Sequence, residues 1–308
     1  MLWRALLVVR CGRYRVRVTI GPPPSRELVP PTPAPDGTLG DQLRAGAAPA
    51  TRSRAWVWLL AGAGGFLAGE IIATVFAVVT GSIAGDHEGL ATIAALREPP
   101  EWYIVSTLLG LWCGFFGGPW LASMTHGTRR LVADMGLRWR WIDLLGVPIG
   151  VAGQFLVALL YLPFEHHIAH FTQKFDAPSQ KLTGGAHGVG FVVIAVLTVV
   201  GAPFFEELFF RGLLLRSFAR LFDTTGSFVG AAGRWIGPAA AIVSTGVLFG
   251  LAHAESLQLL GLATFGVILS AISYRTGRLG MNMAAHSAFN LVAVIAIVAG
   301  GSGGTVLR

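Results

Sequence analysis

The chain has 308 residues, of which 53% are hydrophobic and 13% are charged, and its mean hydropathy is +0.63. Soluble domains carry roughly 25% charged residues, so this composition excludes an ordinary water-soluble globule and indicates several membrane spans. The formal net charge is +7. The arginines lie in loops and in the N-terminal tail, where they set membrane orientation and meet anionic lipid headgroups. We therefore expect the lipid bilayer as a partner and no nucleic acid.

Residues 1–53 form a basic tail that is rich in proline. The tail has no apolar periodicity, so we predict that it is disordered. The rest of the chain is expected to hold N-terminal transmembrane helices in residues 54–187 and a catalytic transmembrane core in residues 188–300.

Beyond the tail, long apolar runs alternate with polar connections. A membrane-spanning helix needs about 20 apolar residues. The runs that satisfy this condition are 55–80, 102–124, 141–162, 192–217, 238–258, 258–274 and 279–299. The connection 85–101 allows a partly embedded eighth span. We predict an all-α, polytopic transmembrane helix bundle with seven to eight spans.

The arginine-rich connections alternate along the chain with arginine-poor ones. By the positive-inside rule this alternation places the N-terminus in the cytoplasm. The expected location is the plasma membrane of a prokaryote.

Glycines recur at four-residue spacing, as in Gly110, Gly114 and Gly118. Small residues at this spacing let helices approach closely, so we predict that these glycines form helix-packing faces within the bundle.

Three ionisable residues, Glu206, Glu207 and Arg211, interrupt the fourth apolar run. A charged side chain at mid-bilayer costs roughly 2.5–3.5 kcal/mol on insertion scales, so such groups usually face a cavity and carry function. Glu207 and Arg211 are four residues apart and share a helix face, which predicts an ion pair. Glu206 is turned about 100° away from Glu207 on a helix with ~3.6 residues per turn. We interpret Glu206 as the working carboxylate.

Further polar side chains lie in the later apolar runs. His253 ends the fifth run, four residues after Phe249. In the last run His286 and Asn290 are four apart on one face, and Asn282 lies one turn earlier on it. A single membrane histidine is as often a helix–helix hydrogen bond as a ligand. Two histidines, an asparagine and an acidic pair on neighbouring spans favour a functional site.

Two kinds of chemistry fit this set of residues. Glu206 with His253 can deprotonate a water, while His286 and Asn290 donate hydrogen bonds to the oxyanion formed when that water attacks an amide. Alternatively, Glu206, His253 and His286 could bind zinc as a two-histidine, one-carboxylate set. The spacing does not decide between them, and the chain has no His-Glu-x-x-His motif.

The ordered motifs resemble those of the CPBP intramembrane protease family, which includes the Abi proteins and the CaaX-prenyl endopeptidases. The three motifs would be Glu-Glu-x-x-x-Arg at 206–211, Phe-x-x-x-His at 249–253 and His-x-x-x-Asn at 286–290. The resemblance covers residues 188–299. It implies a membrane endopeptidase that acts on a peptide or protein at the membrane.

The same resemblance implies a role for each motif residue. Glu206 and His253 would activate the water, and His286 and Asn290 would stabilise the oxyanion. The residues implied to support the site are Glu207, Arg211 and Phe249. The family admits metal-dependent and glutamate-dependent mechanisms; we favour the latter, with no cofactor, and keep zinc as the alternative.

Rival interpretations come from other classes of protein. A transporter could use the same glutamates, Arg211 and the histidines as an ion relay, and a non-catalytic immunity or scaffold protein of the same family could keep them for packing.

Glu70 is a single carboxylate in the first span. It either bonds to a neighbouring helix or lines the substrate path, and the sequence does not choose. The sequence makes no prediction of the oligomeric state.

Overall fold

The chain divides into two compact units, residues 1–35 and 36–308. In the computed structural model, the described residues are 6–11, 14–19, 37–45, 52–165, 167–183, 186–222 and 230–300. The first unit contains an antiparallel hairpin of β1 (Leu6–Cys11) and β2 (Tyr14–Thr19). Its register runs from Leu6 opposite Thr19 to Cys11 opposite Tyr14. This hairpin differs from the structureless tail that we expected, and its valines are residues that favour strands.

A second element within residues 1–53 is α1 (Leu39–Ala45), which belongs to the second unit. Its start is a capping box. The Asp41 amide donates to the Thr38 hydroxyl at 3.1 Å, and the Thr38 amide donates to the Asp41 carboxylate at 3.2 Å. Leu39 is buried in an apolar cluster with Leu215 and Ala219. The end of the predicted tail is therefore packed on the bundle.

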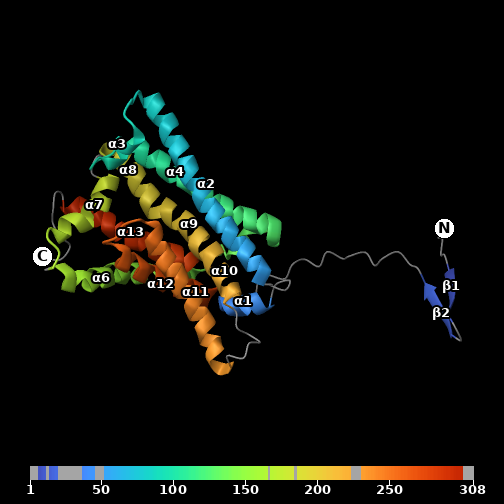
Figure 1. The fold of residues 1–308 in the computed structure, drawn as a ribbon. Helices are drawn as coiled ribbons and strands as arrows, with labels where there is room; N and C mark the ends of the chain where they lie inside the picture. The colour runs from blue at the N-terminus through green and yellow to red at the C-terminus, as the bar shows by residue number, and fades with distance from the viewer. Residues whose placement is uncertain are drawn as a thin grey trace. The chain divides into compact units, whose positions relative to one another are not determined.

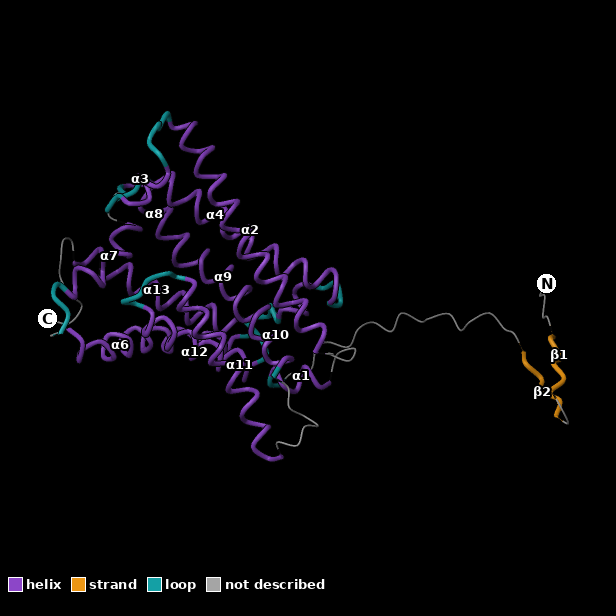
Figure 2. The backbone as a smooth tube through the Cα atoms, viewed as in Figure 1, coloured by secondary structure: helices purple, strands orange, loops and turns teal. Residues whose placement is uncertain are grey.

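Within the described residues, seven helical spans are long and apolar enough to cross a membrane, as predicted (Figures 1 and 2). The first three spans are α2 (Arg52–Ala84), α4 (Glu101–His126) and η1 (Trp141–Leu145) continued by α6 (Gly146–Glu165). The last three are α11 (Gly230–Ala252), α12 (Leu259–Thr276) and α13 (Gly280–Gly300). The protein is an integral membrane protein with an all-α bundle.

The connections between the spans carry three short helices, α3 (Leu90–Ala95), α5 (Leu131–Met135) and α7 (Phe171–Thr183). The six-residue α3 is the only helix in the connection 85–101, every residue of which is described. It is far shorter than a span, so this connection does not supply an eighth one.

The fourth span is one unbroken run of helical segments. These are α8 (Gly188–Val196), η2 (Leu197–Gly201), α9 (Ala202–Glu206), η3 (Glu207–Leu214) and α10 (Leu215–Leu221). The run begins at Gly188, earlier than the predicted residue 192, and has 34 residues. At 1.5 Å per residue an α-helix of this length measures about 50 Å, more than the ~30 Å hydrocarbon core, so the helix must tilt or protrude.

The fifth span ends earlier than predicted. Helix α11 stops at Ala252, and a turn over residues 253–258 leads to α12. The amides of His253 and Ala254 reach back only three residues, to Gly250 and Leu251, and Ala254 has a left-handed φ of 55°. This tight turn ends the helix. His253 therefore lies just outside the helix rather than inside a span.

Three pairs of helices pack side by side: α2 with α4, α6 with α13, and α11 with α12. Glycine makes these close approaches possible. A Cβ on Gly114 of α4 would overlap the Gly65 carbonyl of α2, and a Cβ on Gly150 of α6 would overlap the Ala285 carbonyl of α13. The predicted glycine packing faces are therefore confirmed.

The fourth span runs through the main apolar core of the second unit. Its buried side chains there include Leu208, Phe209, Phe210, Leu213 and Leu214, packed with Trp112, Phe115 and Phe249 from α4 and α11. The two glutamates and Arg211 thus lie on the helix that the neighbouring spans surround.

Candidate active site

The two glutamates lie where the fourth span changes its helical geometry. Glu206 is the last residue of α9, and Glu207 is the first residue of the π-helical segment η3. A second π-helical segment, η2, precedes α9; there the Ala202 amide bonds to the carbonyl of Leu197, five residues back. The next residue, Pro203, has no amide hydrogen and cannot continue the α-helical ladder. Such π-turns are rare and occur frequently at functional sites.

Glu207 is fully buried and every oxygen of its carboxylate has a donor. Oε1 accepts from Nη1 of Arg211 at 2.8 Å and from Nδ1 of His286 at 2.9 Å. Oε2 accepts from Nδ2 of Asn282 at 3.2 Å. The predicted ion pair between Glu207 and Arg211 is confirmed, with both side chains completely inaccessible to solvent. A buried carboxylate surrounded in this way is a structural anchor.

Arg211 joins three spans at this point. Besides Glu207, its Nη2 donates to the carbonyl of Gly266 on α12 at 3.0 Å. Its guanidinium carbon lies 4.5 Å from the centre of the Phe249 ring on α11, a cation–π contact. The fourth, fifth and sixth spans therefore meet around one buried cation.

His286 contacts both glutamates, one with each ring nitrogen. Nδ1 bonds to Oε1 of Glu207, and Nε2 lies 3.8 Å from Oε2 of Glu206. We had expected Glu206 to point elsewhere. The difference arises because the two nitrogens lie on different sides of the imidazole, so one ring reaches both carboxylates where the helix widens. Oε2 of Glu206 is buried and has no hydrogen-bond partner within the described part of the chain.

The tautomer of a neutral His286 follows from its hydrogen bond to Glu207. An ionised carboxylate only accepts, so Nδ1 carries the hydrogen that bonds to Glu207. In a neutral imidazole Nε2 then has a lone pair directed to Glu206. Two acceptors therefore face each other at 3.8 Å, a pair that a donor placed between them would satisfy.

Asn282, which shares a helix face with His286, is a further residue of the site. It is fully buried, and Nδ2 donates both to Glu207 and to the carbonyl of Leu269 at 2.6 Å. Its spacing was the available signal, because it lies four residues before His286 on α13. The contact shows that Asn282 holds Glu207 in place.

His253 and Asn290 each donate a hydrogen bond to a backbone carbonyl. His253 is exposed, and its Nδ1 donates to the Phe249 carbonyl at 2.8 Å. The ring of Phe249 contacts both imidazoles, with centroid distances of 4.8 Å to His253 and 5.6 Å to His286. Asn290 donates from Nδ2 to the carbonyl of Thr198 at 2.9 Å. The structure thus brings Glu206 and His286 together, whereas the hydrogen bonds of His253 and Asn290 run to Phe249 and Thr198.

The residues proposed as zinc ligands do not form a ligand set here. Among the described residues, no group of three histidine, cysteine, aspartate or glutamate side chains is arranged to hold a metal ion. Glu206 and His286 are neighbours, and the hydrogen bond of His253 runs from Nδ1 to the Phe249 carbonyl rather than to either of them. We therefore derive no catalytic step through a metal.

The fold and the site together define a class of protein: an integral membrane helix bundle with a buried glutamate–histidine site built by its last four spans. Residues 188–292 match the family model described as Type II CAAX prenyl endopeptidase Rce1-like. The family assignment from the motifs is confirmed by this match over that segment, which contains the three motifs. No curated protein and no solved structure compared with the chain gives a match.

Proposed function

We propose that this protein is a membrane endopeptidase in which Glu206 acts as the general base toward a water molecule. One observation carries the proposal: Oε2 of Glu206 is buried, has no hydrogen-bond partner among the described residues, and lies 3.8 Å from Nε2 of His286. The match to the CAAX-type endopeptidases supports hydrolysis as the reaction.

The gap between Glu206 and His286 suits one water molecule. A water oxygen at about 2.8 Å from each acceptor can donate one hydrogen to Glu206 and one to His286, which leaves its lone pairs directed outward. The water oxygen attacks the carbonyl carbon of the peptide bond as Glu206 takes its proton. The resulting tetrahedral oxyanion collapses, the carbon–nitrogen bond breaks, and the proton passes from Glu206 to the leaving amine.

Glu207 and its partners hold His286 for this step. The hydrogen bond from Nδ1 to Glu207 fixes the ring orientation and the tautomer, as a carboxylate does for a catalytic imidazole in other hydrolases. Arg211 and Asn282 neutralise and orient Glu207, so that it does not compete for the water proton. We therefore assign these three residues to positioning.

Asn290 and His253 have groups left for the substrate. Asn290 uses one amide hydrogen for the Thr198 carbonyl, and the second can donate to the oxyanion. His253 keeps an exposed imidazole whose Nδ1 is already bonded, and we assign its Nε2 to proton exchange between the site and water. That all four side chains share one water-reachable cavity stays a prediction.

The test uses the purified protein in liposomes with fluorogenic peptides that present a scissile bond near the membrane. Glu206→Gln is isosteric and should reduce cleavage by at least about a hundredfold, because it removes the base. It should change the free energy of unfolding by less than about 1 kcal/mol. The matched control, Glu88→Gln, removes an exposed carboxylate from the connection after α2 and should cleave like the wild type. Full activity of Glu206→Gln would reject the role of Glu206.

Metal dependence is measured on the same preparation. If the glutamate mechanism is right, elemental analysis of active protein should give substoichiometric zinc, and chelation should leave cleavage unchanged. Stoichiometric zinc that is lost together with activity would overturn the metal-free mechanism.

A further inference from the structure

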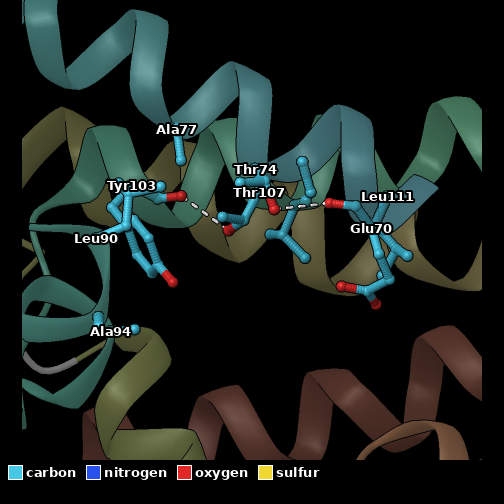
Figure 3. Close-up of a pocket in the computed structure, with 11 residues that line it drawn as sticks. Glu70, Thr74, Ala77, Leu90, Ala94, Tyr103, Thr107 and Leu111 are labelled. Carbon is cyan, nitrogen blue, oxygen red and sulfur yellow. Dashed lines mark hydrogen bonds between the residues drawn. The ribbon is translucent and has the colours of Figure 1, made fainter. Parts of the chain in front are cut away.

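A cavity of about 430 Å³ lies between α2, α3 and α4. Figure 3 shows Glu70 and Tyr103 reaching from α2 and α4 toward the same open side of this cavity. Most of the wall is made of small apolar side chains and leucines. The volume lies within the range of about 300–1,000 Å³ that small ligands and side chains occupy in proteins. We call this space the Glu70 cavity.

The position of Glu70 is unusual for a carboxylate. It lies near the middle of the 30-residue apolar span Ala55–Ala84, and its side chain is exposed. Within the described part of the chain, no hydrogen bond or ion pair is formed by its carboxylate or by the Tyr103 hydroxyl. Ionisable residues inside membrane spans usually pair with another charge or mark a ligand path. Because no internal partner is present among these residues, the carboxylate oxygens of Glu70 are left to bond to a ligand.

The remaining polar groups of the cavity are acceptors. The Thr74 hydroxyl donates to the Glu70 carbonyl at 2.9 Å, and the Thr107 hydroxyl donates to the Tyr103 carbonyl at 2.8 Å. Both hydroxyl hydrogens are thus used within their own helices, as the dashed lines in Figure 3 show, and each hydroxyl oxygen can still accept a hydrogen bond. A carboxylate and acceptor oxygens above an apolar wall match a cation that is carried on an aliphatic stem.

Helix α4 places this cavity next to the candidate active site. Leu108 and Leu111 line the cavity and also pack against the core cluster that contains the fourth span. One residue further, the Trp112 ring stacks on Phe205 with centroids 4.8 Å apart, and Phe205 directly precedes Glu206. Helix α4 therefore contacts both the Glu70 cavity and the residue that precedes Glu206.

We propose that the Glu70 cavity binds a lysine or arginine side chain of the peptide substrate. The aliphatic stem would pack on the alanines and leucines of the wall, and the charged head would bond to Glu70 and to the Tyr103 oxygen. This assignment rests on the proposed peptidase function and adds a substrate class to it: peptides that carry a basic residue near the scissile bond.

The test measures binding rather than cleavage, on full-length Glu206→Gln protein in detergent. The probes are leucine/alanine peptides in which a single lysine is moved one position at a time, each paired with a peptide that has norleucine there. At one register the lysine peptide should bind about tenfold tighter than its norleucine partner, because a charge-assisted hydrogen bond forms. Adding Glu70→Gln should abolish this preference.

The matched control is Glu98→Gln, which removes an exposed carboxylate just before α4 and should keep the preference for lysine. Equal binding of the lysine and norleucine peptides at every register would overturn the proposal, and so would a preference that survives Glu70→Gln. Binding is measured on Glu206→Gln, which should not cleave the peptide. The lysine preference is therefore measured independently of cleavage. A wild type that cleaves no peptide would contradict the peptidase function without deciding the lysine preference.

Discussion

Glu207 and Glu70 are both carboxylates within membrane spans, and their surroundings are opposite. Glu207 has no solvent exposure and receives hydrogen bonds from Arg211, His286 and Asn282. Glu70 is exposed beside a cavity, and its carboxylate has no partner within the described residues. The same residue type therefore serves two purposes. A carboxylate whose charge is fully balanced holds the helices together, whereas one with unused acceptors is suited to a ligand.

Glu206 stands between these two cases. Its Oε2 is buried like Glu207, but like Glu70 it has no hydrogen-bond partner among the described residues. Buried polar atoms without a partner are costly, and native structures keep few of them. Because Oε2 of Glu206 is buried and yet lacks a hydrogen-bond partner, we assign the role of general base to Glu206 and not to Glu207.

The largest expected effect comes from removing the cation beside Glu207. Arg211→Met leaves a buried carboxylate without its opposite charge, and we expect a loss of about 3–5 kcal/mol in the free energy of unfolding. The measurement is equilibrium unfolding in mixed micelles. Arg275→Met is the matched control, since Arg275 is exposed at the end of α12. Equal effects of the two substitutions would show that the Glu207 ion pair is not an anchor.

A smaller effect is expected from the neutral donor to Glu207. Asn282→Ala removes the hydrogen bonds to Oε2 of Glu207 and to the Leu269 carbonyl, both of which are buried. We expect a loss of about 1–3 kcal/mol in the free energy of unfolding, because two acceptors are left unsatisfied. Ser287→Ala on the same helix serves as the control. A change no larger than that of the control would contradict the structural role given to Asn282.

The smallest effect concerns a carboxylate outside the spans. Burial raises the pKa of Asp176, on α7, above its ordinary value of 3.8. The folded protein then binds a proton more tightly than the unfolded chain does, so this group lowers stability as pH rises from about 3.8 through the raised pKa. Asp176→Asn should flatten that part of the stability-against-pH curve, measured by thermal unfolding at low pH. Parallel curves for the two proteins would contradict a burial effect.

The sequence alone was sufficient for the class of protein and for the ion pair. Apolar runs of about 20 residues require membrane helices because backbone groups must be satisfied inside lipid. Seven such helices are present among the described residues. The four-residue spacing of Glu207 and Arg211 brings them to one helix face, and this local geometry is the same in any helical context.

Departures from local geometry were not accessible from the sequence. The left-handed Ala254 ends α11 before His253, although the apolar run continues past it. The π-turns around Glu206 also escaped prediction, because periodicity arguments assume an α-helix throughout the span. The capping box of α1 was readable in Thr38-x-x-Asp41, but the composition of the tail obscured it.

The sequence by itself determined that this chain spans a membrane and carries an acidic pair, two histidines and an asparagine in its last four spans, because hydropathy and helical spacing are local properties. Only the tertiary structure decided that His286 faces both glutamates, that Asn282 completes the shell of Glu207, and that Glu70 is left beside a cavity. Which atoms of separate helices meet depends on the packing angle and register of those helices, and these are set by the close contacts between spans.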